Sequence, residues 1–388
     1  MDQRDTNQDP TRMSSTSLPA AAGPRPQTNA NSKARRLVSM CSTRDPYVIE
    51  KRPTFGQWVK VTWIDLLTIL IVGLLVQVYF FASPFGDRVF PLDVQPDNGS
   101  SNPNPASVIP IDFTYPARRQ MVSNWLIAVI AIAFPTLVIS LMQFRTRSFW
   151  DWNNGLLGFL YALLTSAAFQ ATTKAFIGGL RPNFYDVCQP DITRGRDGGN
   201  RSGLNGIGFR GDMWTRDVCT NADAVRVRDA MQGFPSGHST TMVAAMVYLS
   251  LYLNAKLKVF ANYHTPLWKL IAITVPILGA VLLCGTLVID HTHSWYDIAA
   301  GATIGAVVAF AAYRMVYPSI FDWRINHIPL NRNVPFDDVP RPGLVATARA
   351  GWRSPVKEND TGAARLLGNE GHQGENGVGP GTLNQNTL

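Results

Sequence analysis

The chain has 388 residues, of which 46% are hydrophobic and 16% are charged, and its formal net charge is +8. The apolar residues lie in long runs between polar stretches, which is typical of a polytopic membrane protein and argues against buried core helices in a soluble protein. The basic residues lie mainly in tails and loops. The charge therefore indicates contact with a membrane bilayer that carries anionic headgroups, and no nucleic-acid partner.

The two ends of the chain differ in composition from its middle. Residues 1–55 are rich in Ser, Thr, Pro and Asn and lack the apolar stretch of a secretory signal, so the first true span is expected to direct insertion. Residues 329–388 are also rich in polar residues, Gly and Pro. We expect both segments to be mostly disordered cytosolic tails that flank a membrane domain at 56–328.

Six apolar runs follow one another between the tails, each near the ~20 residues that cross a bilayer. They lie at roughly 61–82, 121–142, 155–173, 238–254, 269–289 and 298–314. The sequence therefore predicts an all-α fold, a polytopic bundle of six transmembrane helices with a long extracytosolic loop between helices 3 and 4.

Basic residues beside the spans set the expected orientation. Lys51, Arg52 and Lys60 precede the first span, and further Lys and Arg residues follow spans two, four and six. This pattern places both termini in the cytosol and the long loop on the other side of the membrane. Arg118 and Arg119, before the second span, count against it.

The expected extracytosolic loops carry features that agree with this orientation. Asn98 and Asn200 each begin an Asn-x-Ser triplet, the acceptor pattern for N-glycosylation. Of the four cysteines, Cys188 and Cys219 lie in the long loop, where a luminal or extracellular setting would allow a disulfide.

A first polar cluster follows the third span. Lys174 and Arg181 are separated by a Gly-containing stretch, and Pro182 stops the helix. A single Lys at a helix end is usually a snorkelling anchor. An ammonium paired with a planar guanidinium instead suits several phosphate oxygens. The pair therefore predicts an anion site.

A second cluster, Pro235-Ser236-Gly237-His238, opens the fourth span. Unpaired N–H groups at a helix start suit an anion, Gly237 permits close approach, and Ser236 supplies a hydroxyl. Without a histidine, an ordinary helix start would be the default interpretation. His238 favours a functional one, as the acid that protonates a departing alkoxide.

The third cluster contains His293 and Asp297, four residues apart and therefore on one face of a helical turn. The carboxylate is expected to fix the tautomer of the imidazole, whose other nitrogen becomes a nucleophile able to form a phosphohistidine. Two histidines near a carboxylate also fit a metal site. Because the neighbouring clusters supply cations, we expect no metal and no cofactor.

Together the three clusters resemble the signature of the type 2 phosphatidic acid phosphatase superfamily. The matching motifs are Lys174-x6-Arg181-Pro182, Pro235-Ser236-Gly237-His238 and His293-x3-Asp297, within about residues 60 to 315. The paired cysteines and the stretch Arg181-Pro182-Asn183-Phe184 especially resemble the fungal lipid phosphate phosphatases, which include diacylglycerol pyrophosphate phosphatases.

This resemblance implies a metal-independent membrane enzyme that removes phosphate from phosphatidate, diacylglycerol pyrophosphate or related lipid phosphates. It also implies roles for individual residues. His293 would be the nucleophile and His238 the acid, with Lys174, Arg181, Ser236 and Gly237 as phosphate ligands.

One departure matters. The family's third cluster begins Ser-Arg, whereas this chain has Thr286 and Leu287 at those places. Losing one such charge contact costs about 3 kcal/mol, or roughly a hundredfold in rate, if nothing replaces it. The candidates to replace it are His291, Arg210, Arg226 and Arg228.

Two other functions stay open at this point. One is a catalytically weakened lipid-phosphate binder of the same fold, and the other is a phosphatase for sphingoid-base, polyprenyl or sugar phosphates. The oligomeric state also stays open, as does the organelle: endoplasmic reticulum, Golgi, vacuole and plasma membrane all satisfy the expected topology.

Overall fold

The structure is a computed structural model that describes residues 52–81, 88–94, 107–108, 111–191, 206–208 and 213–332. Most of both expected tails, the glycosylation triplets at Asn98 and Asn200, and Arg210 lie outside the described residues. The predictions for those segments stay predictions.

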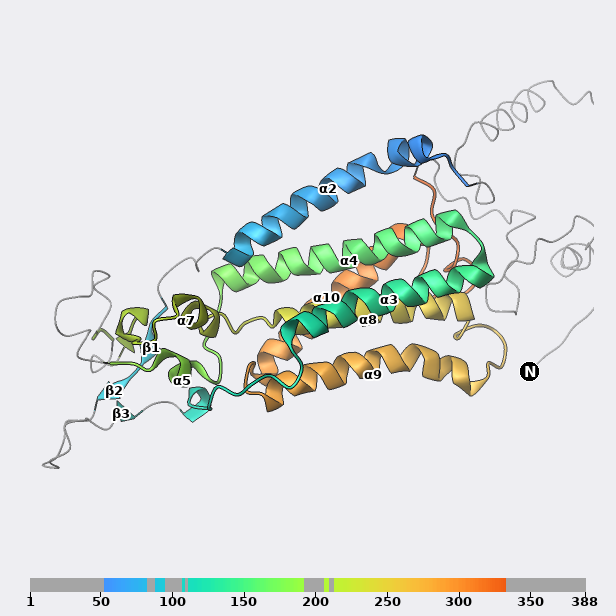
Figure 1. The fold of residues 1–388 in the computed structure, drawn as a ribbon. Coiled ribbons are helices and arrows are strands. Elements are labelled where there is room, and N and C mark those ends of the chain that lie inside the picture. Colours follow the sequence, from blue (N-terminus) through green and yellow to red (C-terminus); the bar gives the residue numbers. More distant parts are fainter. Residues whose placement is uncertain are drawn as a thin grey trace, which may run out of the picture. The chain divides into compact units, whose positions relative to one another are not determined.

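Long helices dominate the described part of the chain, as Figure 1 shows. They are α2 (Phe55–Phe81), α3 (Asn124–Thr146), α4 (Phe149–Phe176), α8 (Gly237–Leu257), α9 (Leu267–Ile289) and α10 (Trp295–Val316). Each predicted apolar run overlaps one of them. All except α8 are long and apolar enough to cross a membrane, five helices among the residues described. The prediction of a polytopic all-α membrane protein is confirmed.

α8 is less apolar than the others because of its place in the bundle. It packs against α3, α4, α9 and α10, which surround it. A helix enclosed by protein needs partners for its polar groups rather than an apolar surface. The hydroxyl of Ser250, for example, lies 2.8 Å from the carbonyl oxygens of Met246 and Ile273.

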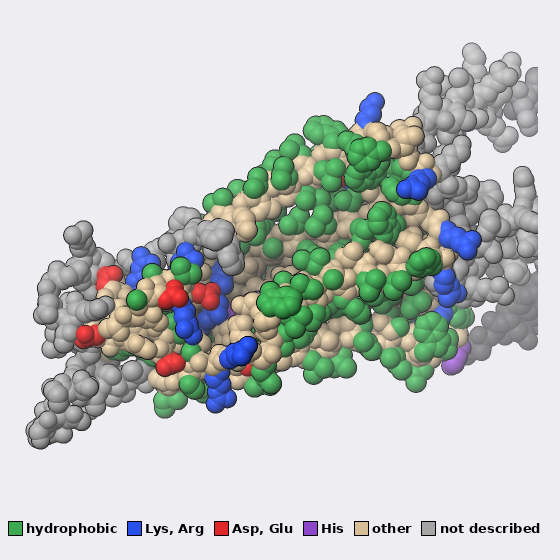
Figure 2. Space-filling model, in the orientation of Figure 1, with side chains coloured by type: hydrophobic (Ala, Val, Ile, Leu, Met, Phe, Trp, Pro, Cys, Tyr) green, Lys and Arg blue, Asp and Glu red, His purple; other side chains and the backbone are tan. Residues whose placement is uncertain are grey.

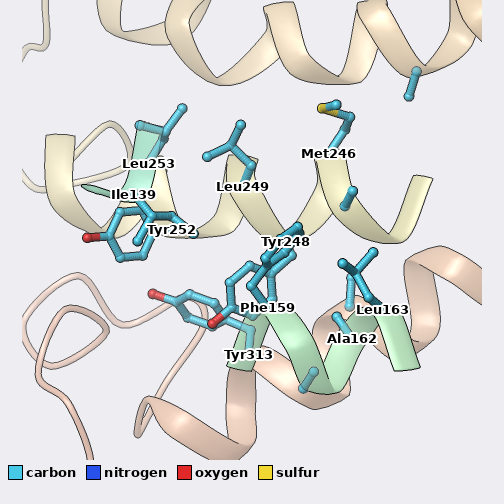
Figure 3. Close-up of a cluster of buried hydrophobic side chains, with 14 of the residues drawn as sticks. Ile139, Phe159, Ala162, Leu163, Met246, Tyr248, Leu249, Tyr252, Leu253 and Tyr313 are labelled. Atoms are coloured by element: carbon cyan, nitrogen blue, oxygen red, sulfur yellow. The ribbon is translucent and has the colours of Figure 1, made fainter. Parts of the chain in front are cut away.

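Aromatic side chains fill the core around α8, as Figure 3 shows. The ring of Tyr248 lies edge-on to that of Tyr313 from α10, with centroids 5.7 Å apart, and 5.9 Å from that of Phe159 on α4. The Tyr248 hydroxyl donates to the carbonyl of Gly155 at 3.1 Å. These contacts join the central helix to both neighbours.

The outer faces of the helices are apolar. Figure 2 shows hydrophobic side chains along their sides, with Lys and Arg gathered toward the two ends. Exposed large hydrophobic residues recur along α2, α3 and α9. In water such a patch would promote association, whereas in a lipid bilayer it is the expected outer surface.

Short elements form a small structure beyond one end of the bundle, which we call the cap. They are β1 (Phe90–Pro91), β2 (Asp93–Val94), β3 (Ser107–Val108), η1 (Ile111–Phe113), α5 (Phe184–Cys188), β4 (Met213–Trp214), η3 (Arg216–Val218) and α7 (Ala224–Ala230). β1 pairs with β4 and β2 with β3, both antiparallel. A separate apolar cluster and a disulfide between Cys188 and Cys219 hold the cap together.

Candidate functional site

One end of the bundle faces the cap, and we call it the site end (Figure 1). α4 and α9 end there, and α8 and α10 begin there. The amide of Ser236 donates to the carbonyl of Asp297 at 3.1 Å, and the hydroxyl of Ser239 donates to the carbonyl of Ile298 at 2.9 Å. These bonds place the starts of α8 and α10 side by side.

Two cations of the first cluster lie at this end. Lys174 is in the last turn of α4, and Arg181 follows in the cap. Arg181 Nη2 donates to Asp229 Oδ1 at 2.9 Å, and Lys174 Nζ lies 3.9 Å from the same oxygen. Arg181 Nε is buried and has no hydrogen-bond partner among the described residues. The Nε–H group is therefore a donor that a further anion can use.

Backbone bonds fix the loop that carries Arg181. Gly179 donates to the carbonyl of Met231 at 3.1 Å, Gly233 donates back to Gly179 at 2.7 Å, and Arg181 donates to Ala230 at 2.9 Å. Gly179 has a φ of 155°, which favours glycine. The segment after α4 is thus paired with the segment before α8, and the first two sequence clusters are held together.

The second cluster forms the start of α8. Ser236 is the N-cap, and its hydroxyl oxygen accepts from the amide of Ser239 at 3.4 Å, which leaves the O–H proton as a donor. Gly237 lies against the side chain of Gln170 on α4, where a Cβ would come within 3.1 Å of the amide nitrogen. His238, the second residue of the helix, is half-buried. The N–H groups of the first turn have no acceptor within the helix.

In the third cluster, His293 lies directly before α10. Its side chain is 1% exposed, and Nδ1 is 3.6 Å from Asp297 Oδ2, which is too long for a hydrogen bond. The same carboxylate oxygen accepts from the amide of Ser294 at 3.0 Å in the capping box of α10. The helix cap therefore holds the carboxylate beside the imidazole.

The charge on His293 is set by its surroundings. Burial holds the pKa of the imidazole well below 6.5, and the positive charges of Arg181, Lys174 and His238 lower it further. Asp229 acts in the opposite direction. At neutral pH the ring is neutral, the state in which a nitrogen lone pair can attack phosphorus. Residues of all three clusters therefore act on one side chain.

His291 and Leu287, which lie near His293 in the sequence, contact aromatic or apolar neighbours. His291 has a φ of 52°, and its ring stacks on that of Tyr115 with centroids 4.0 Å apart. Leu287 is 1% exposed and lies in the apolar core, while its carbonyl accepts from the amides of Thr292 and His293. Its side chain therefore packs the bundle, and its backbone positions the histidine.

The long-loop arginines that the structure describes, Arg226 and Arg228, lie on α7. The side chain of Arg226 is exposed and that of Arg228 is half-buried. Whether either replaces the missing guanidinium stays a prediction.

Asp229 was missed by the sequence reasoning, although it contacts both cations of the first cluster. The one available signal was its place in the last turn of a short helix, where a negative charge is unfavourable without a cation nearby. Among the described residues no three His, Cys, Asp or Glu side chains are grouped as metal ligands. Metal-free chemistry stays a prediction.

Comparison with known proteins identifies the family. The model of the PAP2 superfamily matches residues 155–321, which include all three clusters. Lipid phosphate phosphatase 2 of Arabidopsis thaliana is 31% identical over 211 residues, which make up 54% of this chain and 67% of that protein. The chain belongs to the PAP2 superfamily. The resemblance seen in the sequence is confirmed.

Two further PAP2 relatives have similar identities. Lipid phosphate phosphatase 1 of Arabidopsis thaliana is 33% identical over 208 residues, 54% of this chain and 58% of that protein. Diacylglycerol pyrophosphate phosphatase 1 of Saccharomyces cerevisiae is 29% identical over 210 residues, 53% of this chain and 68% of that protein. No solved structure matches. The PAP2 family and these relatives support a phosphatase enzyme.

Proposed function

We propose that the protein is a membrane lipid phosphate phosphatase that works through a phosphohistidine at position 293. The observation that carries the proposal is the buried, neutral imidazole of His293 within the field of Arg181 and Lys174. Both Arg181 Nε and His293 Nδ1 are buried without a partner among the described residues. Unpaired buried polar atoms are costly, and a bound phosphoryl group would satisfy the guanidinium.

Phosphate binding draws on three kinds of donor. Lys174 and Arg181 supply positive charge, the first turn of α8 supplies N–H groups and the positive end of a helix dipole, and Ser236 supplies its hydroxyl proton. Such donors stabilise the charge that builds up on phosphoryl oxygens in the transition state. They orient the phosphorus toward His293.

In the first step a lone pair of His293 forms a bond to phosphorus, and the bond from phosphorus to the lipid oxygen breaks. His238, whose protonation is favoured by the negative charge of the bound phosphoryl group, gives a proton to that oxygen, so the lipid leaves as a neutral alcohol or as a phosphate monoester. The carboxylate of Asp297 lies near Nδ1 of His293 and favours the positive charge that develops on the His293 ring.

In the second step His238 is neutral and accepts a proton from a water molecule, whose oxygen attacks the phosphorus. The bond between nitrogen and phosphorus breaks, inorganic phosphate leaves, and His293 is again neutral. The use of one histidine as acid and then as base follows from microscopic reversibility. Each cycle consumes one water molecule and breaks one bond between phosphorus and the lipid oxygen.

The names of the relatives and the surroundings of the site support a lipid phosphate as the substrate. The yeast relative is named for diacylglycerol pyrophosphate and the plant relatives for lipid phosphates. Phe176, Ile177 and Trp295 lie at the site end of α4 and α10 with exposed side chains. Apolar and aromatic residues at this level suit a lipid whose chains stay in the bilayer while its headgroup enters the site.

For the orientation, we propose that the site end is extracytosolic and that both termini are cytosolic. A disulfide between Cys188 and Cys219 requires an oxidising compartment, and it lies in the cap at the site end. Arg145 and Arg147 lie at the opposite end, as the positive-inside rule predicts for the cytosol. Protease digestion of sealed vesicles should remove a C-terminal epitope only when the cytosolic face is exposed. A protected epitope there contradicts this orientation.

The central test is release of phosphate from phosphatidate by the purified full chain, with and without a chelator. We expect turnover in both conditions and a loss of about 10³-fold or more in His293→Ala. His264→Ala, a change at an exposed histidine of the opposite end, is the matched control. Undiminished turnover in His293→Ala excludes this residue as nucleophile. Assays with sphingoid-base and polyprenyl phosphates define the substrate class.

One observation favours the second function, a lipid-phosphate binder with weakened turnover. Leu287 stands where the family has Arg, and its side chain is packed in the core rather than directed to an anion. The variant Leu287→Arg separates the two functions. We expect the wild type to hydrolyse lipid phosphates and Leu287→Arg to be less stable, because the new guanidinium would be a buried, unpaired charge. A slow wild type with a large gain in Leu287→Arg supports the binder instead.

A further inference from the structure

Asp229 pairs with both cations of the proposed phosphate site. Its Oδ1 lies 2.9 Å from Arg181 Nη2 and 3.9 Å from Lys174 Nζ. The carboxylate is 53% exposed, whereas the side chains of Arg181 and Lys174 are 11% and 18% exposed. The acid therefore faces the open side of a site whose cations are buried.

The position of Asp229 is fixed by the cap rather than by the ion pair alone. The neighbouring Ala230 accepts from the amide of Arg181 at 2.9 Å, and Met231 accepts from Gly179 at 3.1 Å. Asp229 also lies in the last turn of α7, where the helix dipole disfavours a negative charge. The carboxylate therefore does not stabilise α7, and its stabilising partners are Arg181 and Lys174.

The same cations are those that a phosphoryl group needs. Arg181 presents Nη2 to Asp229 and keeps Nε without a partner among the described residues. An incoming phosphate must therefore share the guanidinium with a carboxylate or displace it. The Asp229 carboxylate and a phosphate on one pair of cations repel each other, which weakens the binding of phosphate.

We propose that Asp229 is an internal counter-ion of the phosphate site, which weakens the binding of free phosphate and thereby speeds its release after hydrolysis. The proposal rests on the proposed function of the site as one that binds a phosphoryl group. In the resting enzyme the carboxylate neutralises part of the charge of Arg181 and Lys174. When phosphate leaves, Asp229 is the anion that remains on Arg181.

The test measures binding of inorganic phosphate to the purified full chain by calorimetric titration. Asp229→Asn keeps the size of the side chain and an acceptor for Arg181 but removes the charge. We expect it to bind phosphate about fivefold more tightly than the wild type, a size typical of one partly exposed charge pair. The inhibition constant for phosphate during turnover should fall by the same factor.

Two further variants act as controls. Asp186→Asn removes a negative charge from the cap, where Asp186 accepts from the amide of Ala117 and contacts neither cation, so phosphate affinity should not change. Asp229→Glu restores the charge and should return the affinity toward that of the wild type. Unchanged or weaker binding in Asp229→Asn overturns the proposal, because a residue that only orients the cations would lower the affinity when lost.

The titration needs no turnover, so it separates the two proposals. If the wild type binds phosphate but does not hydrolyse lipid phosphates, the proposed function fails and the affinity shift still decides the role of Asp229. If the wild type hydrolyses them and the affinities of the wild type and Asp229→Asn are equal, only the counter-ion proposal fails. Failure of both proteins to bind phosphate overturns it as well.

Discussion

The chemistry proposed for His293 depends on how a folded protein disfavours the charged form of one imidazole. The ring is buried beneath the cap and lies in the field of Arg181, Lys174 and His238. Both influences penalise the imidazolium. Asp297 lies nearby, but its carboxylate is also engaged by the amide of Ser294. The neutral state of the His293 imidazole therefore follows from its burial and from the nearby cations.

This surrounding predicts the pH dependence of the reaction. Because the pKa of His293 is lowered below 6.5, the neutral nucleophile predominates above that pH and is lost only in more acidic solution. We expect the acidic limb of kcat/KM for phosphatidate to have its midpoint below pH 6.5. A pH profile of phosphate release measures it, and a midpoint above 6.5 contradicts the assignment.

The pH profile of the Asp229→Asn variant tests the same electrostatic argument. The carboxylate of Asp229 raises the pKa of His293, so its loss should move the acidic limb to lower pH. Asp186→Asn should leave the limb in place, since Asp186 lies at the amide of Ala117. A shift to higher pH in Asp229→Asn would contradict the electrostatic argument.

At the residue scale, spacing along the chain predicted which residue types gather at the site but not all of their partners. His293 and Asp297 are four apart, and the helix start places them together as expected. Asp229 reaches Arg181 only because backbone bonds pair two loop segments, which no local pattern reveals. His291 adopts a left-handed φ and its ring stacks on that of Tyr115, a contact that the sequence does not reveal; its role beside the phosphate ligands stays a prediction.

Among the elements, the pairing of α8 with α10 links helix packing to the site. A Cβ on Gly301 would lie 2.6 Å from the carbonyl oxygen of Ser236, the residue that caps α8. A Cβ on Gly305 would clash with the carbonyl of Thr240, one turn further along. The glycines of α10 therefore permit close approach of the two helices whose starts carry His238 and His293.

This packing predicts that Gly301→Ala reduces both stability and turnover. The added methyl group must push α10 away from Ser236, and such overpacking costs about 1–3 kcal/mol. Gly279→Ala in α9 is the control, because nothing lies within 4 Å of its added Cβ. Alanine favours helix by about 1 kcal/mol, so the control should be neutral or stabilised. Thermal unfolding and phosphate release are measured on both, and equal behaviour would exclude the packing role.

The helices themselves were largely predictable from apolar runs, but their ends were not. The third run was expected at 155–173, whereas α4 begins at Phe149. Its first turns contain Asp151 and Asn154, which a hydropathy pattern reads as loop. The structure buries both: Asp151 pairs with Lys256, and Asn154 donates to the carbonyl of Leu330 at 2.9 Å. Partners inside the bundle thus extend a helix past its apolar run.

For the molecule as a whole, the two ends of the bundle use buried charge differently. At the site end, Arg181 Nε and His293 Nδ1 are buried and have no hydrogen-bond partner among the described residues. At the opposite end, Asp151 forms an ion pair with Lys256 and accepts from the hydroxyls of Tyr252 and Tyr317 at 3.1 Å. That network joins α4, α8 and the segment after α10. At this end, buried charge holds helices together.

The last prediction concerns this network. Lys256→Met leaves Asp151 buried without its cation, which should cost about 3–5 kcal/mol in the free energy of unfolding. The double variant Asp151→Asn, Lys256→Met removes both charges and should recover much of that loss, because the remaining groups are neutral. Free energies of unfolding of the wild type, Lys256→Met, Asp151→Asn and the double variant, obtained from denaturation curves, give the coupling energy.

The activity of the same variants shows whether the ends of the bundle communicate. Lys256 lies 18 residues after His238 on α8, a distance of about 27 Å along the helix. At that distance the loss of one buried charge pair should leave kcat per folded molecule within about twofold of the wild type. A large fall in kcat in the double variant, at temperatures where it is folded, would show instead that α8 transmits the change. In that case the network serves the site as well as the fold.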